Sequence, residues 1–132
     1  MVPQDTREGR VAAAVELARL IGSPEVFDEQ RARRRAELLV DRSYDPDGTA
    51  RQMIAILASG SRAAGLVSLT LPTMVLHGDR DPLVDVSGGR RTAELVPGAE
   101  LRILEGMGHD MPPEYWERIA AGVLDNAAAV AG

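Results

Sequence analysis

Two short apolar runs constrain the fold of this chain more than any other part of its sequence. The first, at residues 73–76, follows a proline and precedes a glycine, and the second, at residues 101–104, comes after the Pro97-Gly98 turn. Such runs are typical of strands that are covered on both faces of a parallel sheet. A helix is expected between them, over residues 86–96. The pattern therefore predicts two parallel strands joined by a right-handed helical crossover.

The remaining segments have the apolar spacing and the end signals of helices. Three helices are expected before the first strand, over residues 6–21, 24–42 and 45–58. A closing helix over residues 112–129 is expected to turn four side chains inward, Trp116, Ile119, Val123 and Leu124. The predicted fold class is therefore α/β. A helical region in residues 1–60 precedes a parallel strand-helix-strand-helix unit in residues 61–132.

The composition narrows the classes of protein to which the chain can belong. The 132 residues include no cysteine, which excludes a disulfide scaffold, and with only one Trp, two Tyr and one Phe the core is expected to be aliphatic. A net charge of −5, with acidic and basic residues interspersed, argues against a nucleic-acid partner. No apolar run approaches the roughly 20 residues of a membrane span, and the amino terminus has no basic and then apolar leader. We therefore expect a cytoplasmic protein without membrane contact.

Two polar loops follow the predicted strands at their carboxyl ends. The first contains His77-Gly78-Asp79-Arg80-Asp81, and the second contains Gly106-Met107-Gly108-His109. Because parallel strands end at the same edge of a sheet, Asp81 and His109 are expected to lie within hydrogen-bonding reach. A carboxylate that accepts the imidazole Nδ1 proton leaves Nε2 available as a general base. The pair thus matches two of the three members of a nucleophilic catalytic triad.

Other tasks for the same residues also fit their chemistry. An aspartate or a histidine alone in a loop is usually a turn former or a satisfied polar group, and His77, at the end of a strand, is interpreted as structural. Carboxylate and imidazole ligands suit several metals, so a metal site can be imagined from four of these residues, His77, Asp79, Asp81 and His109. No two of them share a short ligand spacing, however, and the order of acid before base accounts for the same residues. We therefore expect no metal and no cofactor.

Between residues 71 and 116 the chain resembles the carboxyl-terminal part of the α/β-hydrolase family. The family's acid follows a strand in a His-Gly-x-x-Asp segment, matched by His77 to Asp81, and its base follows the last strand in a segment like that of Gly106 to His109. Gly88-Gly89 and Pro97-Gly98-Ala99 fit the bacterial esterase-like members. The resemblance implies a serine esterase or lipase-like hydrolase of small apolar esters, with Asp81 as orienting acid and His109 as general base. It also implies that residues 1–60 form the cap, or lid, that many members insert.

The family's nucleophile has no match in these residues. Members carry the serine in a Gly-x-Ser-x-Gly segment between an earlier strand and helix, and no such segment occurs here. Ser59 and Ser61 follow a helix instead of a strand, and Ser87 is expected to cap a helix. The chain is therefore expected to be a truncated product or a fragment that supplies only the Asp and His of the triad and is nearly inert alone.

Two functions from different classes fit this pattern. The chain is either the acid–base part of a hydrolase, active when a nucleophile-bearing half completes it, or a non-catalytic interaction module that pairs with a companion chain. In the second case the Asp–His pair is an ancestral remnant. In both cases a two-stranded unit has unpaired edges, so we expect a homo-oligomer or a heteromer.

Overall fold

The computed structural model describes residues 6–131, and these form two compact units. We call residues 6–20 and 28–62 the helical unit, and residues 21–27 and 63–131 the sheet unit. The chain thus leaves the helical unit, contributes a short segment to the sheet unit and then returns. No sequence pattern predicts this interruption. The role of residues 1–60 as a lid stays a prediction.

Three helices make up the helical unit: α1 (Arg7–Ile21), α2 (Glu29–Arg42) and α3 (Pro46–Ala58). Helices α1 and α3 lie where the sequence predicts them, whereas the helix predicted over residues 24–42 begins only at Glu29, after a separate 3-10 turn over Pro24–Val26. Val11 and Val15 of α1 are buried. The side chain of Asp28 starts α2 by accepting the N–H of Arg31. Asp45 starts α3 in the same way, with a proline as the first helical residue.

The sheet unit contains the predicted pair of parallel strands, β1 (Met74–Gly78) and β2 (Glu100–Leu104), which confirms that part of the sequence analysis. Met74 lies opposite Glu100 and Gly78 lies opposite Leu104, so the two strands end together. The helices of this unit are the short 3-10 turn η1 (Pro24–Val26), α4 (Ala63–Leu66), α5 (Val86–Leu95) and α6 (Pro113–Ala131). The short helix α4 is not predicted by the sequence.

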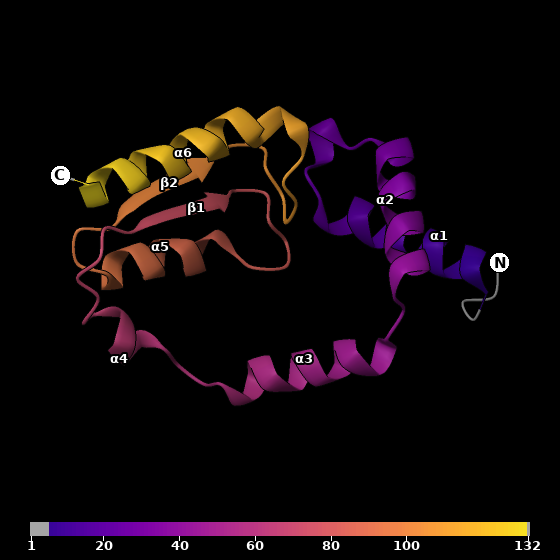
Figure 1. Cartoon of the computed structure of the whole chain (residues 1–132), viewed down its shortest axis with the longest axis horizontal. Coiled ribbons are helices and arrows are strands. Elements are labelled where there is room, and N and C mark those ends of the chain that lie inside the picture. Colours follow the sequence, from indigo (N-terminus) through magenta and orange to yellow (C-terminus); the bar gives the residue numbers. More distant parts are fainter. Residues whose placement is uncertain (1–5, 132) are drawn as a thin grey trace. The chain divides into compact units, whose positions relative to one another are not determined.

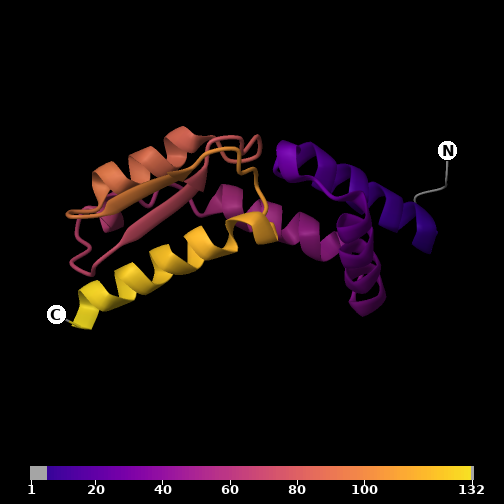
Figure 2. The same ribbon diagram turned by 90° about the horizontal axis from the view of Figure 1, so that it is seen from above.

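Two helices cover opposite faces of this sheet (Figures 1 and 2). Gly122 allows α6 to approach the face that carries Met74 and Leu76, because a side chain at this position would overlap theirs. On the other face, Gly89 of α5 packs directly on the imidazole of His77. Successive side chains of a strand point to opposite faces, which is why Leu76 faces α6 while His77 faces α5. The ring of His77 is consequently enclosed, with its side chain 14% exposed.

The core of the sheet unit forms where β2 leads into its loop. Leu104, Met107 and Tyr115 are buried together, and Ile119 packs against them. The expectation of a purely aliphatic core is therefore wrong at Tyr115. Its ring can be buried because its hydroxyl donates a hydrogen bond to the carbonyl oxygen of Glu105.

Helix α6 buries fewer of its side chains than the sequence predicts. Ile119 is partly buried, but Trp116 is 60% exposed, and Val123 and Leu124 are exposed to a similar degree. Among the described residues the sheet has two strands, so it is narrower than the apolar stripe of the helix. The prediction that these three side chains face inward is wrong for this reason.

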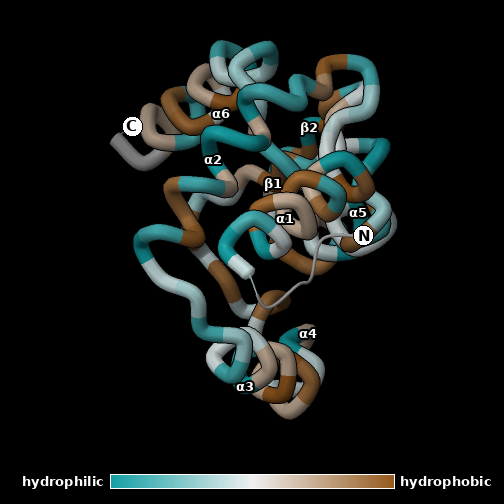
Figure 3. Tube along the Cα trace, turned by 90° about the vertical axis from the view of Figure 1, so that its right-hand side faces the viewer, coloured by the Kyte–Doolittle hydropathy of each residue, from teal (hydrophilic) through white to brown (hydrophobic). Residues whose placement is uncertain are grey.

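Helix α3 is apolar along much of its length (Figure 3). Met53, Ile54, Ile56 and Leu57 are each more than half exposed. Met111, in the segment before α6, is also exposed, whereas Met107 is buried. Within residues 6–131, no helix combines the length and the apolar character that crossing a bilayer requires.

The end of β1 gives a sharp test of this packing. A Cβ atom at Gly78 would lie 2.1 Å from the carbonyl oxygen of Met107, a backbone atom that cannot move aside alone. Gly78→Ala should therefore lower the free energy of unfolding by about 2 kcal/mol or more, measured by urea denaturation. Gly65→Ala is the matched control, because nothing lies within 4 Å of a Cβ there. Equal effects of both substitutions would contradict the described approach of the two loops.

Candidate active site

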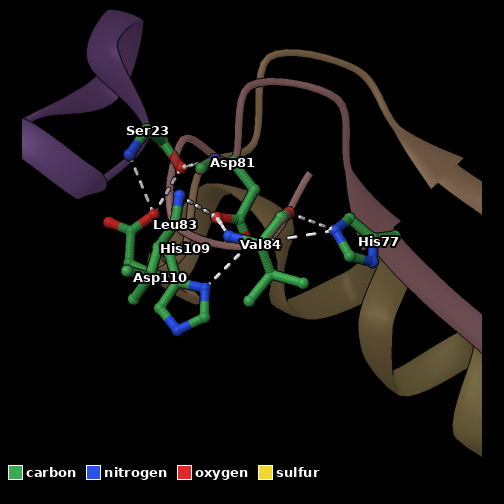
Figure 4. Close-up of polar contacts among 8 residues, drawn as sticks. Ser23, His77, Asp81, Leu83, Val84, His109 and Asp110 are labelled. Carbon is green, nitrogen blue, oxygen red and sulfur yellow. Dashed lines mark hydrogen bonds and ion pairs between the residues drawn. The ribbon is translucent and has the colours of Figure 1, made fainter. Parts of the chain in front are cut away.

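The carboxylate of Asp81 lies in the turn that follows β1 (Figure 4). Its Oδ1 atom accepts hydrogen bonds from the backbone N–H groups of Leu83 and Val84, at 2.9 and 2.8 Å. The side chain is 7% exposed. The largest single effect on the pKa of Asp81 is burial, which raises it. The hydrogen bonds that the carboxylate accepts, mainly from Val84 and His109, together outweigh burial and hold the pKa below its ordinary value. Asp81 is therefore ionised at neutral pH.

His109, in the loop after β2, forms the other half of the pair. Its Nδ1 atom lies 2.7 Å from Oδ2 of Asp81. Because an ionised carboxylate can only accept, Nδ1 carries the proton and the neutral ring has its lone pair on Nε2. The side chain is 39% exposed, and no residue in the described part of the chain hydrogen-bonds Nε2. The predicted hydrogen bond between Asp81 and His109 is thus confirmed, and it leaves a basic nitrogen accessible.

Backbone contacts join the loop after β1 to the loop after β2. The carboxylate of Asp79 accepts the Gly106 N–H at 2.7 Å, and the Arg80 N–H donates to the Met107 carbonyl oxygen at 3.0 Å. Gly106 has a φ of +80°, which glycine adopts without strain, and the hydroxyl of Tyr115 occupies the space that a Cβ would need. These contacts extend the register of the strands into the loops, so the backbone determines how far apart Asp81 and His109 lie.

His77 braces the turn that holds the carboxylate. Its Nε2 atom lies 2.9 Å from the carbonyl oxygen of Val84, so this nitrogen must donate a proton. Val84 in turn donates its own N–H to Asp81. The same imidazole nitrogen lies 3.9 Å from Oδ2 of Asp81, beyond hydrogen-bonding distance. This geometry supports the interpretation of His77 as a structural residue.

A contact that the sequence does not predict holds the other side of the His109 loop (Figure 4). The hydroxyl of Ser23 donates to Oδ1 of Asp110 at 2.6 Å and accepts the N–H of Gly108 at 2.9 Å. The N–H of His109 donates to the carbonyl oxygen of Ile21 at 2.7 Å. Most of the chain separates these partners, and neither a serine before a proline nor an aspartate after a histidine is a pattern from which their contact could be predicted.

The candidate serines occupy helix ends and a connecting segment. Ser59 ends α3 and its hydroxyl donates to a carbonyl oxygen of that helix, and Ser61 lies farther along in the helical unit. Ser87 is in the first turn of α5 but does not cap it, because the carboxylate of Asp85 stands at the cap position and accepts the Ser87 N–H. The prediction that Ser87 caps the helix is therefore wrong. Within the described part of the sheet unit the ring of His109 hydrogen-bonds only Asp81, so Ser87 is not engaged by it.

The carboxylates near the site are occupied by hydrogen-bond donors. The carboxylate of Asp79 accepts a hydrogen bond from the Gly106 N–H. The carboxylate of Asp81 accepts hydrogen bonds from two backbone N–H groups and from the imidazole of His109. Across the described residues, no three His, Asp or Glu side chains are grouped so that they could hold a metal ion. The set considered from the sequence, His77, Asp79, Asp81 and His109, is not such a group.

Proteins of similar sequence or structure include several hydrolytic enzymes. Rhodomycin D methylesterase DnrP of Streptomyces peucetius is 30% identical over 128 residues, which are 96% of this chain and 43% of that protein. Monoacylglycerol lipase of Mycolicibacterium smegmatis is 30% identical over 72% of this chain and 33% of its own length. Among solved structures, the esterase RhEst1 from Rhodococcus sp. ECU1013 matches 97% of this chain and 44% of its own chain, with a TM-score of 0.66 and 23% identity. No protein-family model matches the sequence.

The fold and the site together define a class of protein. A parallel sheet with helices on both faces carries an aspartate–histidine pair beyond the carboxyl ends of its strands, which is where open α/β sheets place their functional groups. The similar proteins are α/β-hydrolases, and this chain belongs to the α/β-hydrolase family. The partial α/β-hydrolase fold predicted from the sequence is thereby confirmed. The chain spans less than half the length of the curated relatives and of the solved structure that it matches.

The stabilising effect of the Asp81 charge should disappear in acid. Because its pKa is lower in the folded chain than the ordinary value, the carboxylate stabilises the fold above about pH 4, and this contribution is lost as the pH falls through the lower folded pKa. Asp81→Asn should therefore lower the free energy of unfolding most at about pH 6, and the difference from the unmodified chain should shrink toward about pH 3, measured by urea unfolding. A difference that stays constant over this range would show that the charge contributes nothing.

Proposed function

We propose that this chain supplies the acid–base pair of a serine hydrolase that cleaves carboxylic esters with small apolar groups. Asp81 orients and stabilises the imidazole, and His109 is the general base. The observation that carries the proposal is the 2.7 Å hydrogen bond that fixes the proton on Nδ1 of His109 and leaves Nε2 basic. The activities of two relatives, a methylesterase and a monoacylglycerol lipase, support an ester as the substrate.

In this role His109 moves one proton in each half of the reaction. Nε2 takes the proton of a serine hydroxyl as the oxygen attacks the ester carbonyl carbon, and it then gives that proton to the departing alkoxide. In the second half it takes a proton from water, which attacks the acyl group, and returns the proton to the serine. The ionised Asp81 stabilises the imidazolium that forms each time.

The nucleophile and the oxyanion hole come from residues outside this sequence. The 132 residues contain no Gly-x-Ser-x-Gly segment, and within the described sheet unit His109 does not engage Ser87. A base without a nucleophile provides no covalent catalysis, and oxyanion donors alone are worth about 10²–10³ in rate. The proposed function therefore requires completion by a nucleophile-bearing part.

A chimera tests this function directly. The matching segment of the Streptomyces peucetius methylesterase is replaced by this chain, so that the remainder of the relative supplies what is missing. The chimera should hydrolyse an activated ester, and both His109→Ala and Asp81→Asn should lower kcat by about 10³-fold or more, because each disrupts the base. Ser87→Ala, outside the proposed machinery, should leave the rate unchanged. A folded, active chimera that tolerates the changes at His109 and Asp81 would contradict the proposal.

The chain alone should be inert toward reagents for catalytic serines. We expect no burst of product with an activated ester and no stoichiometric labelling by a fluorophosphonate, because no serine of the described sheet unit is paired with His109 and the Gly-x-Ser-x-Gly segment is missing from these residues. Intact-mass spectrometry of the treated chain measures this. Labelling of Ser59, Ser61 or Ser87 would show that the chain carries its own nucleophile.

The same features support a proposal about assembly. Among the described residues each strand of the sheet has one neighbour, so β1 and β2 each keep an unpaired edge, and several large apolar side chains of α3 and α6 are exposed. We propose that the chain works in a homo-oligomer or in a heteromer with a nucleophile-bearing partner. The alternative function, a non-catalytic interaction module, draws on the same exposed surfaces and needs no reaction at His109.

Native mass spectrometry separates these possibilities. We expect an oligomer, or a complex with a second chain, that buries at least about 1,000 Å². A complex without esterase activity would favour the interaction module. A stable monomer of 14.1 kDa at micromolar concentration would contradict both versions of the assembly.

A further inference from the structure

We propose that Ser23 is a positioning residue for His109 and acts through the backbone on either side of that histidine. The inference rests on the proposed function, since His109 needs accurate placement only if it is the base. Ser23 does not touch the reacting atoms in this proposal. Its task is to hold the loop from which the imidazole projects.

Ser23 makes three hydrogen bonds to the two residues that flank His109. The side chain is completely buried, and its hydroxyl donates to Oδ1 of Asp110 and accepts the N–H of Gly108. The backbone N–H of Ser23 donates to the same Asp110 oxygen at 2.9 Å. With the bond from the His109 N–H to Ile21, each of the three consecutive residues in this loop is tied to segment 21–23.

The backbones of the two segments are also in direct contact. A Cβ atom at Gly108 would lie 2.4 Å from the carbonyl carbon and oxygen of Gly22, so this approach requires glycine at position 108. Main-chain atoms cannot give way as the end of a flexible side chain can. The loop therefore has little freedom to shift while segment 21–23 stays in place.

Ser23 does not perform the task that its sequence position favours. It stands at the amino-terminal end of η1, where a serine hydroxyl ordinarily accepts an N–H of the helix, yet its side chain makes no such bond. The hydroxyl instead uses its donor and its acceptor capacity on Asp110 and Gly108. A residue whose only role was to start η1 would not be oriented in this way.

The position of the imidazole depends on these contacts of segment 21–23, because only one side-chain contact holds the ring itself. The ring of His109 hydrogen-bonds only Asp81 among the described residues and is 39% exposed. Whether that bond forms is decided by where the backbone places the Cβ atom of His109. Loss of the Ser23 hydroxyl also leaves the buried N–H of Gly108 without an acceptor, which favours opening of the loop.

The chain itself provides the measurement, because it contains only two histidines. In 15N NMR spectra, His109 should report an Nδ1-protonated ring and His77 an Nε2-protonated ring. In Ser23→Ala we expect the His109 signals to move toward a mixture of tautomers while those of His77 stay in place. The Gly108 amide should exchange with solvent about tenfold faster, the factor that corresponds to loss of one hydrogen bond of ordinary strength.

Matched variants separate positioning from general destabilisation. Ser68→Ala removes an exposed hydroxyl that bonds only locally, to Gly65, and should change neither readout. Asp110→Asn keeps an oxygen that can accept both Ser23 donors and should resemble the unmodified chain. Asp110→Ala removes this acceptor but leaves the Ser23 hydroxyl on the Gly108 N–H, so it should shift the His109 tautomer as Ser23→Ala does. This pair keeps the test decisive if Ser23→Ala does not fold.

Two results would overturn the proposal. One is a folded Ser23→Ala variant whose His109 tautomer and Gly108 exchange match those of the unmodified chain, or a folded Asp110→Ala variant whose His109 tautomer matches. The other is equal perturbation of His77 and His109, which would indicate general loosening of the sheet unit. Because these readouts need no catalysis, an inactive chimera would reject the proposed function and leave the positioning result intact.

Discussion

The parallel pairing of β1 with β2 positions every group of the candidate site. Gly78 lies opposite Leu104, so the two loops start from the same edge of the sheet at the same level. A shift of register by one residue would separate Asp81 from His109 and turn His77 away from α5. Further contacts between the loops, such as that of Asp79 with Gly106, depend on this alignment. The chemistry of the pair is thus a consequence of strand geometry.

Part of this arrangement can be predicted from the sequence, because it depends on local patterns. Apolar runs bounded by proline and glycine define the strands, and the order of acid before base identifies Asp81 and His109. Burial is harder to predict: Trp116 has the helical spacing of a core residue, yet it is exposed because the described sheet is too narrow to cover it. The hydrogen bond between Ser23 and Asp110 joins two common polar residues from distant parts of the chain. Such a pair has no characteristic spacing or periodicity by which it could be recognised in the sequence.

Asp81 and His109 are held in different ways, and this suits the different roles that we propose for them. Asp81 is nearly enclosed, and backbone N–H groups fix its carboxylate before any reaction begins. His109 is half-open, with backbone atoms held on both sides and one ring nitrogen accessible. Backbone dipoles are already oriented around the charged Asp81, and the Nε2 side of His109 is open to a reactant. This is the arrangement that catalysis by preorganised groups requires.

The link between segment 21–23 and residues 108–110 also bears on how the chain reaches its folded state. Ser23 and Asp110 are 87 positions apart, so their hydrogen bonds cannot form until the whole stretch of chain between them has been synthesised. Contacts between residues so distant along a chain close late and slow the folding of the element that needs them. We therefore expect the loop of His109 to become ordered late, after the local elements of the sheet unit have formed.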